Sequence, residues 1–445
     1  MKDHLSISLN KRDLLLNSVA GFLVLLIIAT FTFDSANDYI CVAVWIINLI
    51  FCVKFYRCLP LFVLFAFLFK YNYESRYYFF EHLMLSANPS FQTPYFINKV
   101  LLINACFLFS LGVCIPSKVY KYAIDIKKIA FESTYLFWLL CVVGFFMAQF
   151  GVSGSSLLSG GRYGGAGIDK SPMFEYFILI FFIMLIIQPS KSILAAMATY
   201  LLLAFFSLRS FVFGGRVEVV QIVILFLYFK WFLRNKGSKP LFFTLAGVGM
   251  YVSAVMGLIR GNPIRFFKGD YGYYLNPYNM LFDKPKQPWL LTQEGDVLHA
   301  SARILGLIEE GLLSTSQRII SFLGNLFALV IPRSFFPPYV NLAEFRKDLY
   351  SSGGGGMISA YFYAWMGYAG PVAAGLFIGL VIRSGYLKNN LFLKIYAVSI
   401  LFTFPRWIAY GPVLLFKFCI YSLFLYFVFN LFFNSFLKKK HEIAY

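Results

Sequence analysis

The chain has little charge, and acidic residues are its scarcest component. Charged residues make up 13% of the 445 residues, and Asp and Glu together number only 20. Hydrophobic residues make up 60%. This excludes an ordinary soluble domain, in which roughly a quarter of the residues are charged. The acidic residues also form no cluster suited to Mg²⁺ or Mn²⁺, so we expect no metal site and no cofactor.

Cysteine is also missing from the long loop in which disulfides could stabilise an outer domain. All seven cysteines fall within apolar segments or at their ends, and none lies in the longest loop, residues 260–356. A disulfide scaffold is therefore excluded there, and the spacing indicates neither a cysteine nucleophile nor a zinc site. The first apolar segment has basic flanks but no small-residue cleavage site, so we expect a retained anchor rather than a signal peptide.

Long apolar runs, in contrast, are abundant. A membrane-spanning helix needs roughly 20 mostly apolar residues, and this criterion predicts about twelve spans. They lie near residues 14–33, 39–53, 57–70, 98–115, 132–150, 173–188, 192–209, 217–233, 240–259, 357–382, 391–404 and 412–434. We therefore expect an all-α polytopic membrane protein with helices within 1–259, a large outer loop over 260–356, and the last helices and a basic tail over 357–445.

The basic residues orient these predicted helices. Twenty Lys and Arg lie at alternating junctions, which we assign to the cytoplasm because positive residues concentrate there. These junctions are residues 2–12, 54–57, 118–128, 191, 230–239, 383–394 and 438–440. Both termini are therefore predicted to be cytoplasmic and the large loop periplasmic, in a bacterial inner membrane. The net charge of +19 thus reflects topology and does not indicate a nucleic-acid partner.

Arginine is enriched on the predicted outer side, where 11 of the 15 arginines lie. A guanidinium group binds phosphate or carboxylate through two parallel hydrogen bonds, whereas Lys acts as a point charge. Ordinary ion pairing is the alternative, because most acidic residues share that side. The candidate ligands for an anionic substrate are Arg162, Arg209, Arg216, Arg260, Arg333, Arg346, Arg406 and Lys417.

Glycine clusters precede three helices whose N-termini are predicted to face outward: Gly160–Gly167, Gly214–Gly215 and Gly353–Gly356. Helix N-termini attract anions through free N–H groups, although glycine is also common in membrane-helix interfaces. A polyprenyl diphosphate sugar fits this pattern, because its lipid tail needs a cleft between spans. The stretch Asp270–Tyr278 suits sugar stacking, although tyrosine also anchors helices at the interface.

The loop 260–356 is predicted to contain two helices. The first, Glu294–Leu313, carries three candidate general bases, Glu294, Asp296 and His299, with His299 and Arg303 sharing a face at i, i+4. A solvated helix face is the alternative for each. The second helix, about 317–331, is capped near Ser314 and apolar on nearly all sides, so we expect it at the membrane interface or dipping into it.

Three stretches carry a family resemblance. In Phe211–Val220 a Gly-Gly-Arg opens a helix, in Leu326–Pro338 an apolar helix ends in Ile-Pro and an aromatic-proline turn, and Gly353–Gly370 joins Gly-Met-Ile-Ser to an aromatic span and Gly-Tyr-Ala-Gly. With these stretches the sequence resembles the Wzy-type oligosaccharide repeat-unit polymerases of O-antigen and enterobacterial common antigen synthesis. Arg162 and Arg406 also lie where such proteins tend to carry arginine.

The resemblance implies a metal-independent glycosyltransferase with its active site facing the periplasm. It would transfer a growing glycan from undecaprenyl diphosphate to a new lipid-linked repeat unit, with a chain-length regulator as a further partner. A lipid-linked oligosaccharide flippase or transporter, or an O-antigen ligase, are alternatives. A metal-dependent lipid-sugar transferase that uses Asp34 and Asp38 as metal ligands is a weaker alternative. These residues lie in the short loop between the first two predicted spans, where they are better suited to capping helices.

Overall fold

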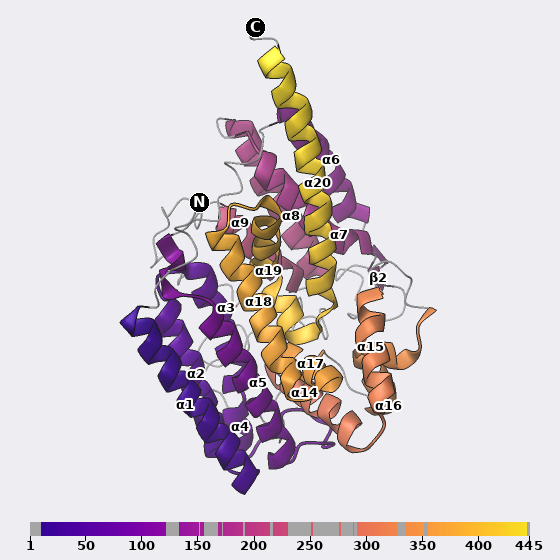
Figure 1. Cartoon of the computed structure of the whole chain (residues 1–445). Helices are drawn as coiled ribbons and strands as arrows, with labels where there is room; N and C mark the ends of the chain where they lie inside the picture. The colour runs from indigo at the N-terminus through magenta and orange to yellow at the C-terminus, as the bar shows by residue number, and fades with distance from the viewer. Residues whose placement is uncertain are drawn as a thin grey trace. The chain divides into compact units, whose positions relative to one another are not determined.

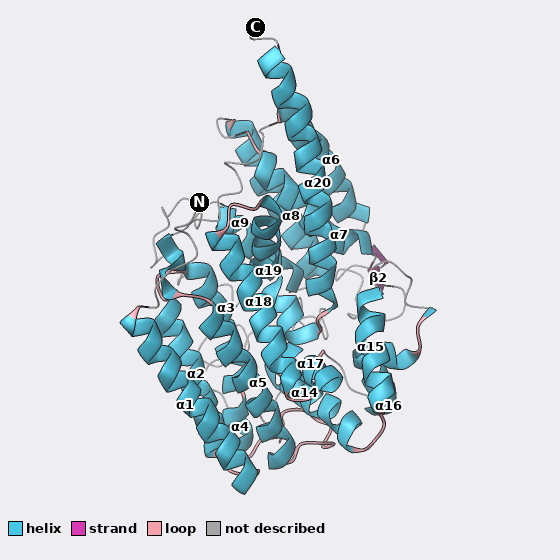
Figure 2. Cartoon of the chain, in the orientation of Figure 1, coloured by secondary structure: helices cyan, strands magenta, loops and turns pink. Residues whose placement is uncertain are grey.

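The computed structural model describes residues 10–121, 133–150, 152–154, 168–170, 172–189, 192–213, 217–229, 251, 276, 288, 292–327, 335–350 and 355–442. These residues are almost wholly helical, as Figure 2 shows. One short antiparallel ribbon pairs β1 (Val152–Gly154) with β2 (Ile168–Lys170). The predicted all-α class is therefore confirmed for the described residues.

Five helices in this part of the chain are long and apolar enough to cross a membrane. They are α1 (Lys11–Phe33), α5 (Pro94–Cys114), α8 (Ile193–Phe213), α18 (Ala369–Leu387) and α19 (Leu391–Tyr410). Each coincides with a predicted span or with part of one, and the protein is membrane-embedded.

Other helices match predicted spans but are shorter or less apolar. They are α2 (Tyr39–Phe55), α3 (Leu59–Tyr73), α6 (Thr134–Phe150), α7 (Pro172–Ile187), α9 (Val217–Leu227) and α20 (Val413–Glu442). The predicted span 240–259 lies outside the described residues, apart from Tyr251. The number twelve and the orientation of the helices remain predictions.

The chain forms two compact units (Figure 1). The first contains Met1–Ile124 and Pro285–Val428, and the second contains Asp125–Lys284 and Phe429–Tyr445. Helices α1 to α5 and α14 (Gln293–Glu309) to α19 belong to the first unit, and α6 to α9 belong to the second. The sequence-based division at 259 and 356 concerns membrane topology and remains a prediction.

Helix α5 is the central helix of the first unit. It packs against α1, α2, α14, α17 and α18, and most of its residues are buried. Helix α18 runs parallel to it, because Gly375 faces Ser110 while Gly379 faces Cys114 one turn further along both helices. Small residues four apart let helix backbones approach closely, which is a common packing mode within membranes.

The prediction of a single helix over 357–382 is wrong. The structure has a short helix α17 (Ile358–Met366), a break at Gly367, and then α18. Gly367 has φ +63°, a left-handed conformation that favours glycine. Gly370 is pressed against the backbone of Phe362, so the two helices meet in a tight hairpin that a larger residue would obstruct.

Helix α17 runs antiparallel to α5. Ser359 at its start donates a hydrogen bond to Asn104, whereas Tyr363 near its end lies 5.3 Å from the Nζ of Lys99, an earlier residue of α5. Since α18 runs parallel to α5, α17 and α18 run in opposite directions and form a helical hairpin. A continuous apolar sequence did not reveal this reversal.

Gly355 and Gly356, the described glycines of the cluster before α17, are buried in this packing. Gly355 is pressed against the backbone of Tyr410. Two residues later, the Met357 N–H donates a hydrogen bond to the Ser301 Oγ at 2.8 Å. The Gly356 N–H lies 3.4 Å from the Tyr361 hydroxyl. Side chains of the protein therefore engage the N–H groups of Gly356 and Met357 at the predicted anion site, whereas Gly353 and Gly354 lie outside the described residues.

Candidate functional site

Helix α14 carries several residues of the candidate site. Its N-cap is Thr292, whose hydroxyl accepts a hydrogen bond from the Gly295 N–H at 3.1 Å. Residues 297–307 of the helix are all buried, among them Val297, Ile304 and Leu307. The helix packs against α3, α5 and α17, so this part of the outer loop belongs to the helix bundle rather than to a separate solvated layer.

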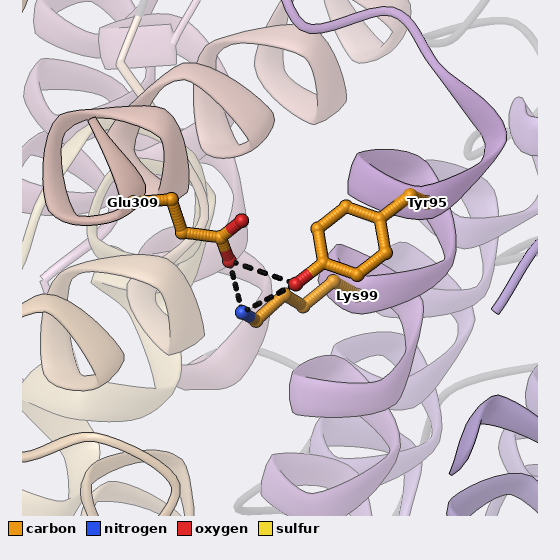
Figure 3. Close-up of polar contacts among 3 residues, drawn as sticks. All are labelled: Tyr95, Lys99 and Glu309. Carbon is orange, nitrogen blue, oxygen red and sulfur yellow. Dashed lines mark hydrogen bonds and ion pairs between the residues drawn. The ribbon is translucent and has the colours of Figure 1, made fainter.

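An ion pair ties each end of α14 to the bundle. Glu294 in the first turn pairs with Lys70 of α3, and Glu309 at the last residue pairs with Lys99 of α5. At the second contact, the Tyr95 hydroxyl lies 3.2 Å from both the Glu309 carboxylate and the Lys99 ammonium (Figure 3). Glu294, a predicted general base, is thus engaged by a lysine.

Three buried nitrogen-rich side chains lie between these ends. They are His299 and Arg303 of α14 and Arg346 of α16 (Leu342–Tyr350), here called the cationic cluster. All three are at most 1% exposed. The Arg303 Nε lies 3.2 Å from the His299 Nε2, which confirms that these residues share a helix face. Two guanidinium groups buried in one cluster create a strongly positive environment, because Arg stays charged.

The environment of His299 keeps its ring neutral. Burial lowers the pKa of His299 to about 4, the charges of Arg303 and Arg346 act in the same direction, and the contact with Ser90 opposes them. The His299 Nε2 lies 2.8 Å from the Ser90 carbonyl oxygen, to which it donates when it carries the ring proton. In that tautomer the Arg303 contact is a close approach rather than a second hydrogen bond. This geometry suits a positioning role better than proton abstraction.

Arg346 connects the cluster to the neighbouring helices. Burial lowers the pKa of Arg346, whereas the nearby Tyr361, Glu344 and Asp296 raise it. Asp296, another predicted general base, is exposed in the first turn of α14. The structure therefore brings Asp296 and His299 into the surroundings of Arg346, as a common site requires.

Arg406 lies in the same neighbourhood. It is half-buried on α19, and its guanidinium carbon is 5.9 Å from the ring centroid of Tyr410. The Tyr410 carbonyl oxygen lies 3.5 Å from the hydroxyl of Tyr361, which interacts with Arg346. A chain of contacts thus leads from Arg346 through two tyrosines to Arg406.

The other predicted ligands fall elsewhere. Arg209 is on α8 in the second unit and donates from its Nη2 to the Gln149 carbonyl at 2.9 Å. Gln149 is in the last turn of α6, so this cation stabilises a helix C-terminus. Lys417 is half-buried near the start of α20. The predicted ligands that lie outside the described residues are Arg162, Arg216, Arg260 and Arg333.

Sequence reasoning missed Glu74, which lies between α3 and α4 (Ser75–Phe80). The Thr292 hydroxyl donates to its Oε2 at 3.0 Å, so Glu74 contacts the N-cap of α14. Burial, together with the charge of Glu294, raises the pKa of Glu74 to about 7, against the opposing effects of Thr292, Lys70 and Arg76. A carboxyl group that titrates near neutral pH suits general acid–base chemistry. Its only sequence signal was an acidic residue inside an aromatic stretch.

No protein-family model, no curated protein and no solved structure matches the chain.

Proposed function

We propose that the protein polymerises lipid-linked oligosaccharide repeat units at the periplasmic face of a bacterial inner membrane. The growing glycan on undecaprenyl diphosphate is the donor, and a sugar hydroxyl of a new lipid-linked repeat unit is the acceptor. The observation that carries this proposal is the cationic cluster. Two completely buried arginines, Arg303 on α14 and Arg346 on α16, are the strongest feature for binding an anionic group.

The cluster fits the chemical demand of this reaction. The acceptor oxygen bonds to the anomeric carbon while the bond from that carbon to the diphosphate oxygen breaks, leaving the electron pair on the diphosphate. Buried guanidinium groups stabilise this developing charge more than they stabilise the ground state, and that difference accelerates the reaction. No metal ion takes part in the proposed mechanism.

A general base, here a carboxylate, must accept the proton of the acceptor sugar hydroxyl. Glu74 is the base that we favour, because the pKa of Glu74 lies at about 7, and Asp296 and Glu294 are the alternatives. In this assignment His299 stays neutral and does not take up the proton. Because the cluster is fully buried, side chains around it must move before substrate can reach it.

The experiment is a deletion in the source organism, followed by separation of its surface glycans by size. A polymerase deletion should leave a single repeat unit on the lipid anchor and remove all longer products. Loss of the single-repeat product as well indicates a ligase or a flippase, and an unchanged ladder excludes all three functions. Purified protein should then convert lipid-linked repeat units to longer chains, including in the presence of EDTA.

A further inference from the structure

Helix α15 (Thr315–Phe327) buries a polar face and exposes an apolar one, which is the reverse of a surface helix in a soluble protein. Its face toward the protein carries small and polar residues, Ser321, Gly324 and Asn325, which are buried. Its outward face carries Ile319, Ile320, Leu323 and Phe327, which are 43% to 57% exposed. The spacing i, i+1, i+4, i+8 places these four on one face. A helix in contact with water would present the opposite arrangement.

Hydrogen bonds fix the orientation of the helix. The Asn325 side-chain amide donates to the Val340 carbonyl at 2.6 Å, and the Trp365 indole N–H donates to the Ser321 hydroxyl at 3.0 Å. Rotation of α15 to bury its apolar face would break these bonds inside the protein, at the cost of unsatisfied buried groups. The apolar residues are therefore held outward.

The helix is also anchored beside a membrane span. The Arg318 Nε donates to the Ala364 carbonyl at 2.5 Å, and the Phe322 ring lies 5.3 Å from that of Trp365. Both partners belong to α17, which turns directly into α18 (Figure 1). Outward residues of α18 such as Leu376 and Leu380 are likewise apolar and exposed, as a lipid-facing surface requires.

We infer that the outward face of α15 contacts the acyl chains of the lipid bilayer. The four residues carry no charge, and the adjoining span places them at the membrane. The described part of the helix has 13 residues, or a length of about 20 Å. Its N-terminal end is polar, with a reciprocal pair of hydrogen bonds between Ser314 and Gln317. This inference does not depend on the proposed reaction.

Spin labels on the full chain in liposomes test this contact. The variants Ile319→Cys, Ile320→Cys, Leu323→Cys and Phe327→Cys are made in a folded background without the native cysteines, and each is labelled. We expect their labels to collide readily with oxygen, which partitions into lipid, and poorly with a water-soluble nickel chelate. Ser316→Cys, one turn earlier on the same face, should show the reverse. High nickel accessibility at the four positions, or low accessibility to both reagents, overturns the inference, since these results mean water or a covering protein.

A matched pair of charge substitutions gives a second measurement. Leu323→Asp places a carboxylate in lipid, so it should lower the melting temperature of the protein in nanodiscs. Ser316→Asp adds the same charge at the polar end and should leave the melting temperature unchanged. Equal melting temperatures for the two variants contradict lipid contact at Leu323.

Discussion

Lys99 of α5 and Glu309 of α14 form an ion pair between residues 210 positions apart in the sequence (Figure 3). The Lys99 ammonium also lies 5.3 Å from the ring centroids of Tyr95 and Tyr363. Lys99 is only 6% exposed, so these contacts replace its hydration. The pair therefore holds the end of α14, and with it the cationic cluster, against the membrane helices.

Glu309→Gln should destabilise the protein by leaving the Lys99 ammonium buried without its counter-ion. We expect a loss of about 1–3 kcal/mol, less than the roughly 3–5 kcal/mol of a fully buried pair, because Glu309 is partly exposed. Adding Lys99→Met should restore part of the loss. Denaturant or thermal unfolding of the purified protein in detergent measures both effects.

The pair at the other end of α14 is the control. The Lys70 side chain is 40% exposed, so its pairing with Glu294 is screened by water. Lys70→Met should therefore cost less than about 1 kcal/mol. Similar losses for Lys70→Met and Glu309→Gln would show that burial does not distinguish the two pairs.

Most helices of this fold were predictable from the lengths of apolar runs. The ends of α1 and α2 fall close to their predicted positions, because few polar residues interrupt these runs. The reversal at Gly367 was not predictable, since two short helices joined by a tight turn and one straight helix can have the same apolar composition. The cause is backbone geometry at Gly367 and close packing at Gly370, both of which depend on tertiary contacts.

The site was less predictable than the fold. Local spacing was sufficient to place His299 beside Arg303, which are four residues apart. The approach of Arg346 to His299 required the folded chain. Residue type alone also could not show whether an arginine binds an anionic substrate or caps the C-terminus of a helix. In the structure Arg209 caps a helix, because it donates to the Gln149 carbonyl.

Glu74 should make stability fall as pH rises. Its pKa is raised in the folded protein from an ordinary value of 4.5 to about 7, so its stabilising contribution is complete below pH 4.5 and is lost as pH rises through 7. The full effect is up to roughly 3 kcal/mol. Melting temperatures between pH 4.5 and 8 should decline more steeply for the wild type than for Glu74→Gln. Glu81→Gln, at the exposed end of α4, should retain the wild-type slope.

His299 should make the stability of the protein fall as pH decreases, which is opposite to the effect of Glu74. Because its pKa is lowered from 6.5 to about 4 in the folded protein, its contribution is complete above pH 6.5 and is lost as pH falls through 4. His299→Gln, whose side chain can still donate to the Ser90 carbonyl, should remove this loss. The melting temperature of this variant should thus decline less than that of the wild type between pH 6.5 and 4. A decline equal to that of the wild type would mean that His299 is accessible to water.

Gly370→Ala should disrupt the hairpin between α17 and α18. An added Cβ would overlap the Phe362 carbonyl, which is backbone and cannot move aside. The expected loss is about 1–3 kcal/mol, typical of overpacking, measured by unfolding in detergent. Gly21→Ala is the matched control, because its Cβ would meet only the Phe109 ring at 3.2 Å, and a ring can shift. Equal stability of the two variants would contradict the close approach at Gly370.

Arg346→Lys should impair polymerisation while leaving the fold intact. Lysine keeps the positive charge but loses the planar fork that binds two phosphate oxygens together. Removing one charge-stabilising donor lowers rates by roughly 10²–10³-fold, and we expect the lower end of that range because the charge remains. The rate of repeat-unit addition by purified protein measures the effect, and the melting temperature reports on folding.

Arg209→Lys is the matched control for this substitution. Arg209 donates to a single backbone carbonyl, that of Gln149, and a lysine ammonium can make the same contact. The control should therefore add repeat units at close to the wild-type rate. If Arg346→Lys is equally active, the cationic cluster only supports the fold, and the anionic substrate must bind elsewhere. If Arg209→Lys is the slower variant, the substrate contacts lie in the second unit.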